Sequence, residues 1–217
     1  MIETGIYFDD IHSYYDMDLI LSEADIPPAK PKTTYIDIPG ADGSLDISEA
    51  HGEIRFSDRE CVFTFTMKPT DSMTWEEKQT EISNLLNGKT MKIVLDKDDE
   101  YYYTGRCTVD DYSVDKKIRQ IVVKVKAKPY KYRIYVTTVN VNLTTESKKI
   151  YLTNGRKTVS PSITCTNDNT SVEVDGMILK LNAGTHKILD IQLKQGVNPL
   201  SVSGSGIITF TYQEADL

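Results

Sequence analysis

The sequence predicts a mainly β protein with one α-helix: an N-terminal β-sheet or split-barrel domain that carries the helix, followed by a C-terminal β-sandwich. Three observations support this fold class. Apolar and polar residues alternate in short runs along most of the 217 residues, as in half-buried strands. Only residues 73–87 show apolar residues at helical spacing. After residue 133, short alternating runs are separated by turn residues, which is typical of a sandwich or jelly roll.

Residues 38–67 are predicted to form the centre of the first domain. They begin with two turn signals, Pro39-Gly40 and Asp42-Gly43, where glycine supplies the positive φ that tight turns need. A strand follows in which every second residue is apolar: Cys61, Phe63, Phe65 and Met67. This alternation predicts a sheet that is packed on one face and partly covered on the other.

The chain before this segment is predicted to contain short strands at residues 6–8, 19–21 and 34–38. Residues 26–32 contain three prolines, which remove amide donors and exclude a helix. We interpret residues 26–32 as a polyproline-like arm or edge segment. The favoured interpretation is a loop that hugs its own domain, and the alternative is an arm that reaches a neighbouring molecule.

One helix is predicted at residues 73–87. Thr74 and Glu77 are three residues apart, as in a capping box, and Gly88 is a C-terminal stop signal. The apolar stripe consists of Trp75, Ile82, Leu85 and Leu86, with Gln79 in the gap. We expect Trp75 to anchor the helix on the sheet rather than to stack on a ligand.

Further strands and the domain boundary follow the helix. The predicted elements are a hairpin of residues 91–95 and 101–104 with an acidic tip at 96–100, a continuing strand at 105–109, a turn at 115–117 and a strand at 121–127. Pro129 should end the sheet, because proline cannot donate to a central ladder. The predicted domains are therefore residues 1–133 and 134–217.

The net charge of −7 lies entirely before Ile134, because the later residues contain equal numbers of acidic and basic side chains. An acidic first domain argues against a nucleic-acid-binding protein with a basic face. No apolar run is long enough to span a membrane, and the first residues lack the features of a secretory signal. We therefore expect synthesis and assembly in a cytosol.

The residues that could carry chemistry are scattered. The three cysteines, Cys61, Cys107 and Cys165, lie in strand-like patterns and are expected to be buried free thiols, with a Cys61–Cys107 disulfide as the less favoured alternative. His12, His51 and His186 are far apart, and no nucleophile elbow or phosphate loop is present. We therefore predict no catalytic, cofactor-binding or metal-binding residues, and no enzyme.

Two other function classes remain open as alternatives. A sandwich can bind glycans on exposed aromatic rings, and the second domain offers Tyr135, Tyr151, Phe210 and Tyr212. A glycan-cleaving enzyme would need two carboxylates that face each other across a cleft, which sequence alone cannot pair. A structural or adaptor role is favoured over both.

The ordered set of segments resembles the distal tail proteins of long-tailed, siphovirus-type bacteriophages or prophages. The first domain contributes residues 38–46, the strand end Phe63-Thr64-Phe65, the helix end Leu85-Leu86-Asn87-Gly88 and the junction at residues 128–132. The second domain contributes residues 160–163, 196–198 and 206–210. The resemblance covers almost the whole chain, and the order of the segments carries it.

This resemblance implies a structural virion protein at the tail tip. The first domain would form a hexameric ring that caps the tail tube, and the second would be a galectin-like or carbohydrate-module-like sandwich. The implied partners are further copies of the chain, the tail tube protein and the tail-tip or tail-associated lysin protein, with receptor-binding proteins as further candidates for host attachment. DNA would be passing cargo only.

Tyr101, Tyr102 and Tyr103 are the predicted oligomer interface. Three consecutive tyrosines place rings on both faces of a strand, and tyrosine is enriched at protein interfaces. The alternative is that two rings pack inside the domain and one reaches the surface. If the interface prediction holds, Tyr102→Glu should break the ring without unfolding the monomer.

Overall fold

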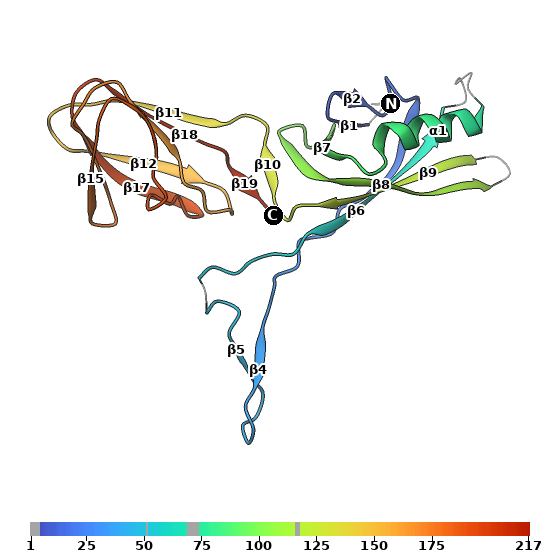
Figure 1. The fold of residues 1–217 in the computed structure, drawn as a ribbon, viewed down its shortest axis with the longest axis horizontal. Helices are drawn as coiled ribbons and strands as arrows, with labels where there is room; N and C mark the ends of the chain where they lie inside the picture. Colours follow the sequence, from blue (N-terminus) through green and yellow to red (C-terminus); the bar gives the residue numbers. More distant parts are fainter. Residues whose placement is uncertain (1–4, 51, 69–73, 116–117) are drawn as a thin grey trace. The chain divides into compact units, whose positions relative to one another are not determined.

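The computed structural model describes residues 5–50, 52–68, 74–115 and 118–217. The chain divides into two compact units, residues 1–131 together with Leu217, and residues 132–216 (Figure 1). The predicted mainly β architecture with one helix is confirmed. His51, the predicted helix start at Met73 and the centre of the predicted turn at 115–117 lie outside the described residues.

The first unit is built on one antiparallel sheet. Its strands are β1 (Ile6–Phe8), β2 (Ile11–His12), β3 (Leu19–Asp25), β6 (Arg59–Met67), β7 (Thr90–Leu95), β8 (Tyr101–Asp115) and β9 (Ile118–Ala127). They lie in the order β2-β1-β7-β8-β9-β6-β3. A separate pair, β4 (Tyr35–Asp37) and β5 (Ser44–Asp46), forms a hairpin outside this sheet.

The core of the first unit lies on one face of the sheet. Cys61, Phe63, Phe65 and Met67 of β6 are buried, and the residues between them are only half-buried. Helix α1 (Trp75–Leu86) packs in the same cluster through Trp75, Ile82 and Leu86. The alternation predicted for β6 and the anchoring role predicted for Trp75 are therefore confirmed.

Helix α1 begins with the predicted capping box. The Thr74 hydroxyl accepts a hydrogen bond from the Glu77 amide at 3.3 Å, and the Glu77 carboxylate accepts one from the Thr74 amide at 2.9 Å. The Thr74 amide and the Thr74 hydroxyl both donate to the Glu77 carboxylate, at 2.9 Å and 2.8 Å, and these two bonds lower the pKa of Glu77 below its ordinary value. Lys78 is a buried residue that the sequence did not single out, and its Nζ donates to the Met17 carbonyl at 3.1 Å.

The second unit consists of two four-stranded antiparallel sheets around one core. The first sheet has the order β11-β18-β13-β16, with β11 (Thr137–Asn142), β13 (Ser162–Cys165), β16 (Gly184–Lys187) and β18 (Ile207–Tyr212). The second has the order β12-β17-β14-β15, with β12 (Lys148–Asn154), β14 (Thr170–Val174), β15 (Met177–Leu181) and β17 (Gly196–Ser203). The short strands β10 (Lys131–Arg133) and β19 (Ala215–Asp216) pair with each other. Apolar side chains from both sheets form a single cluster, as in a sandwich.

All three cysteines are buried and free, which confirms the favoured prediction and shows that the Cys61–Cys107 disulfide was wrong. Burial raises the pKa of the Cys61 thiol to about 11 and that of Cys107 to about 12.

We expect the folded chain to resist thiol-specific reagents at pH 8. The thiolate is the reactive form, and about one in a thousand or fewer of the Cys61 and Cys107 thiols is ionised at pH 8. Labelling with a chromogenic disulfide reagent should be slow in buffer and complete in denaturant. Because the native pKa values are raised, the thiols stabilise the fold below about pH 9, and this contribution is lost as the pH rises toward 11–12. Fast labelling of the native chain at pH 8 would contradict the burial of these thiols.

Candidate assembly surface

A two-stranded arm leaves the sheet of the first unit between β3 and β6 (Figure 1). We define the hairpin arm as residues 30–57. Near its base, the Ser57 amide donates to the Lys30 carbonyl at 2.8 Å and the Lys32 amide to the Arg55 carbonyl at 2.7 Å. Strands β4 and β5 continue the ribbon, with Ile36 opposite Leu45. The favoured interpretation of residues 26–32, a loop that hugs its own domain, holds where the segment begins, since Ile26 packs against the core and Ala29 is buried. The hairpin that follows, residues 32–46, is exposed.

The tip of the hairpin arm is formed by the two predicted turn signals. Gly40 and Gly43 have φ values of +82° and +75°, which residues with a Cβ rarely adopt. The Ala41 amide donates to the Ile38 carbonyl at 3.1 Å and closes the turn between them. These local features are sufficient to reverse the direction of the chain at the tip, without contacts to the rest of the domain.

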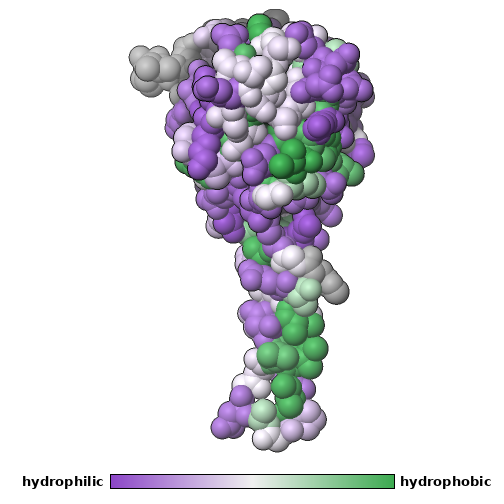
Figure 2. All heavy atoms as spheres, turned by 90° about the vertical axis from the view of Figure 1, so that its left-hand side faces the viewer, coloured by the Kyte–Doolittle hydropathy of each residue, from purple (hydrophilic) through white to green (hydrophobic). Residues whose placement is uncertain are grey.

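The hairpin arm has one apolar and one polar face. Ile36, Ile38 and Leu45 share the apolar face by strand alternation, and their exposed fractions are 47%, 47% and 52%. Figure 2 shows hydrophobic residues in a continuous stripe along the arm. The polar face carries Asp37 and Asp46, which accept hydrogen bonds from serines on the same ribbon.

This apolar face is unusual for a surface element. A two-stranded hairpin is at best marginally stable in water, and it gains nothing from apolar side chains that remain solvated. Contiguous exposed apolar residues on a soluble protein commonly mark a site of interaction with another molecule. The hairpin arm is therefore the strongest candidate assembly surface in the described part of the chain.

Arg59 holds the root of the hairpin arm. Arg59 is 6% exposed, and its guanidinium donates to the Pro27 carbonyl at 3.4 Å and to the Pro129 carbonyl. It also lies 5.4 Å from the centre of the Tyr103 ring, a cation–π contact. Arg59, on the strand that follows the arm, thereby links Pro27, which precedes the arm, to Pro129 at the end of the sheet. No motif in the sequence singles out Arg59, although its alternation with Cys61 and Phe63 places an arginine on the core-facing side of β6.

We expect Arg59→Met to destabilise the first unit by about 2 kcal/mol, because it leaves two partly buried carbonyls, those of Pro27 and Pro129, without their donor. Urea unfolding measures this loss, and limited proteolysis should show faster cleavage within the arm. Arg55→Met is the matched control, since Arg55 is an exposed arginine on the arm itself. An unchanged urea midpoint for Arg59→Met would contradict the anchoring role.

The structure separates the three predicted interface tyrosines. Tyr103 is 7% exposed and belongs to the core. Tyr101 and Tyr102 are half-buried, and the ammonium groups of Lys131 and Lys92 lie 4.2 Å and 5.0 Å from the centres of their rings. Only Tyr101 and Tyr102 can contribute surface, and their role in an interface remains a prediction.

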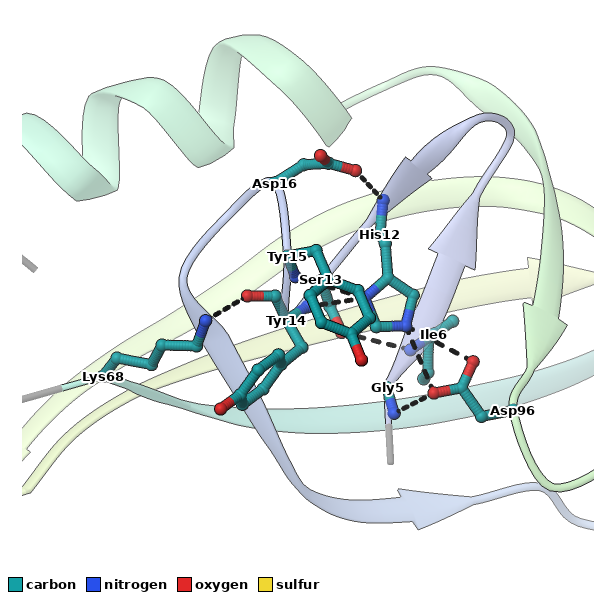
Figure 3. A network of polar contacts seen from close by, with 9 residues as sticks. All are labelled: Gly5, Ile6, His12, Ser13, Tyr14, Tyr15, Asp16, Lys68 and Asp96. Carbon is teal, nitrogen blue, oxygen red and sulfur yellow. Dashed lines mark hydrogen bonds and ion pairs between the residues drawn. The ribbon is translucent and has the colours of Figure 1, made fainter. Parts of the chain in front are cut away.

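His12 is the centre of a polar network at the edge of the sheet (Figure 3). It is 2% exposed, and its Nε2 lies 3.2 Å and 3.3 Å from the two Asp96 carboxylate oxygens. Its Nδ1 accepts hydrogen bonds from the amides of Tyr14 and Tyr15, both at 3.2 Å. Both ring nitrogens are therefore occupied within the fold, and the arrangement is structural. Among the described residues, no cluster of His, Cys, Asp and Glu side chains could hold a metal ion.

Asp96→Ala is expected to cost about 1–3 kcal/mol of stability, because it leaves the buried His12 Nε2 without its partner. The same substitution removes the acceptor of the Gly5 amide, which lies 2.6 Å from the Asp96 carboxylate. Thermal unfolding of Asp96→Ala against Asp99→Ala, an exposed acid three residues away, measures the difference. Equal midpoints would show that the network contributes nothing to stability.

The aromatic residues proposed for glycan stacking are also placed by the structure. Phe210 and Tyr212 are buried in the core of the second unit and cannot present a ring to a sugar. Tyr135 and Tyr151 are well exposed. No helix in the described residues is long and apolar enough to cross a membrane.

Comparison with known proteins identifies the family. A family model described as "Phage tail protein RIFT-related domain" matches residues 11–145. The crystal structure of the Dit protein of phage SPP1, described as a paradigm of the hub adsorption apparatus in phages that infect Gram-positive bacteria, has the same fold. It matches with a TM-score of 0.70 and 16% identity over 97% of this chain and 98% of that one.

Two further comparisons add nothing to this assignment. A conserved protein of unknown function from Pseudomonas aeruginosa PAO1 aligns at 12% identity over 90% of this chain and 100% of that one, but its TM-score is only 0.27. No curated protein sequence matches. The resemblance to distal tail proteins is confirmed by the family match and the shared fold. Because the matched residues make up more than half of the sequence, the chain belongs to the phage tail proteins with a RIFT-related domain and is a structural component of a siphophage-type tail.

Proposed function

We propose that this protein is the distal tail hub, in which six copies form a ring at the end of the tail tube. Its partners would be the tail tube protein on one side and the tail-tip or tail-associated lysin protein on the other. Residues 1–133 would form the ring, and residues 134–217 would be a carbohydrate-module-like sandwich available to other tail-tip components. The chain would act as a scaffold and not as an enzyme.

The hairpin arm is the observation that carries this proposal. Its apolar residues Ile36, Ile38 and Leu45 are solvated in the single chain, and burial in an interface would stabilise each of them by about 1.5–3 kcal/mol if it were complete. Ring closure gives every copy both an arm and a neighbour to receive it, so that no arm remains exposed. A monomeric adaptor would leave the same surface open to aggregation.

The proposed place in the virion can be tested by electron microscopy of purified virions with gold-labelled antibodies against the chain. The proposal predicts labelling at the end of the tail that is distant from the head. Labelling along the tube or on the capsid would contradict it. Antibodies raised against the tail tube protein provide the control for access along the tail.

A further inference from the structure

Four aspartate or asparagine residues are followed directly by a glycine: Asp42, Asn87, Asn154 and Asp175. In such a pair, the glycine amide nitrogen can attack the side-chain carbonyl carbon of the preceding residue and close a succinimide ring. Glycine favours this reaction because it has no Cβ to obstruct the attack. In unstructured chains an Asn-Gly pair reacts faster than an Asp-Gly pair, so that the sequence alone ranks the two asparagines first. The fold reverses this order.

The fold blocks the reaction at Asn87, which follows helix α1. The Gly88 amide, which would be the attacking group, donates to the Cys107 carbonyl at 2.9 Å. The Asn87 side-chain oxygen accepts a hydrogen bond from the Val109 amide at 3.2 Å. Both reacting groups are therefore held by hydrogen bonds to β8.

Asn154 is held even more firmly. It is 3% exposed, and its side-chain amide donates to the carbonyls of Lys157 and Leu193 at 2.9 Å and 2.8 Å. Gly155 has no free space around it, since a Cβ there would lie 2.7 Å from the Ala215 carbonyl oxygen. Ring closure would have to break both hydrogen bonds in a closely packed site.

Asp175 and Gly176 form the two-residue turn between β14 and β15. Their φ values are +49° and +79°, and a type I′ hairpin turn requires positive values at both positions. Val174 and Met177 pair directly on either side of the turn, and Val174 belongs to the core of the second unit. Rotation of the Asp175 backbone toward ring closure would therefore disturb a strand pair that is anchored in the core.

None of these restraints applies to Asp42 and Gly43 at the tip of the hairpin arm. Residues 38–43 join Asp37 to Ser44, the last pair of the β4–β5 ladder, so this connection is longer than a two-residue turn. Asp42 and Gly43 are both exposed. Within the described part of the chain, neither the Asp42 carboxylate nor the Gly43 amide takes part in a hydrogen bond. A Cβ at Gly43 would meet no atom within 4 Å, so the attack is unobstructed.

The other aspartates of the hairpin arm lack this freedom. The carboxylates of Asp37 and Asp46 accept hydrogen bonds from Ser44 and Ser48, respectively. Each of the two aspartates is also followed by an isoleucine, whose branched side chain shields the amide nitrogen. The arm thus contains a single reactive pair.

We propose that Asp42-Gly43 is a site of spontaneous isomerisation and the main site of such modification in the folded chain. The Gly43 nitrogen forms a bond to the side-chain carboxyl carbon of Asp42. The carboxyl group loses a hydroxyl and the nitrogen loses its hydrogen, and these leave together as water. Hydrolysis then adds water back and opens the ring at either carbonyl, which returns aspartate or gives isoaspartate. The composition of the chain is unchanged, and no oxidant, enzyme or cofactor takes part.

Isoaspartate alters the tip because the main chain then runs through the side-chain carbon of residue 42. This adds one carbon to the backbone of the turn and leaves the former main-chain carboxyl group as a side group. Gly40 and Gly43 set the direction of the returning strand, so the modified tip presents the apolar face of the arm differently. We expect modified chains to assemble less well. This expectation rests on the proposed ring, whereas the modification itself does not.

Incubation of the native chain in heavy-oxygen water tests the modification, because each ring opening incorporates one heavy oxygen atom. Peptide mapping by mass spectrometry measures the label at all four sites, and electron-transfer fragmentation distinguishes isoaspartate from aspartate. Asp42→Glu is the matched variant, because it keeps the charge but would have to close a larger ring that forms far more slowly. A parallel sample in guanidinium chloride gives the rates without the fold.

In the native chain, residue 42 should gain label at least about tenfold faster than the other three sites, because those sites react only while they are locally open. In the unfolded chain the order should reverse, with the two asparagines fastest. Asp42→Glu should abolish the label in the arm and leave the other sites unchanged. Faster labelling of either asparagine in the native chain, or an equally labelled arm in Asp42→Glu, would overturn the proposal.

Light scattering on fresh and aged chains separates the modification from the ring. Aged wild-type chains that contain isoaspartate should lose part of the high-mass species, and aged Asp42→Glu chains should keep it. If aged wild-type chains assemble like fresh ones, the effect of the tip on assembly is overturned and the modification site stands. If the fresh chain never assembles, the proposed ring fails, and the label at residue 42 still decides the modification.

Discussion

Ile36→Asp combined with Leu45→Asp leaves the chain folded but prevents its assembly. Both side chains are about half-exposed and lie on the apolar face of the hairpin arm, so their loss removes no core contact. The free energy of unfolding should therefore change by less than about 0.5 kcal/mol. In an interface, the loss of two buried aliphatic groups amounts to about 3 kcal/mol or more, and two buried carboxylates without partners add to it.

Self-association of this double variant should accordingly weaken by more than about 100-fold. Sedimentation at several concentrations measures the effect, and urea unfolding verifies the fold. Leu189→Asp is the control, because Leu189 is an exposed leucine of the second unit. An Ile36→Asp/Leu45→Asp chain that assembles like the wild type would remove the hairpin arm from the interface.

Phe65→Ala should have the largest effect on stability, about 3–5 kcal/mol. Phe65 of β6 is fully buried, and its ring centroid lies 6.1 Å from that of Phe8. Its removal leaves a cavity between two sheet strands that cannot collapse without moving the sheet. Thr64→Ala, on the opposite face of the same strand, should change the stability by less than about 1 kcal/mol.

The same variant tests whether the two units unfold independently. Each unit has its own hydrophobic cluster, so we expect two calorimetric transitions, of which Phe65→Ala lowers only one. Phe210→Ala, in the core of the second unit, should lower the other. If Phe65→Ala shifts both transitions equally, the predicted domains, residues 1–133 and 134–217, are a single folding unit.

Local patterns were sufficient to predict much of the fold. The alternation in β6 identified its buried face, because a period of two leaves little choice once one face is apolar. The capping box of Thr74 and Glu77 fixed the start of α1, since both partners lie within four residues. Such features depend on neighbours in sequence, which is why they could be predicted without a structure.

The candidate assembly surface could be predicted only in part. The two turn signals were predicted correctly, and the proline-rich segment at residues 26–32 allowed an arm as the less favoured alternative. The apolar residues Ile36, Ile38 and Leu45, however, look the same in sequence whether they face a core or a partner.

The molar mass of the purified chain in solution is the most direct test of the proposed hub. Light scattering behind a sizing column, across a concentration series, should reveal a species of about six times 24.5 kDa that forms as the concentration rises. The same series with Ile36→Asp/Leu45→Asp should show only the 24.5-kDa chain. A wild-type protein that remains a single 24.5-kDa species at every concentration would contradict the proposed ring.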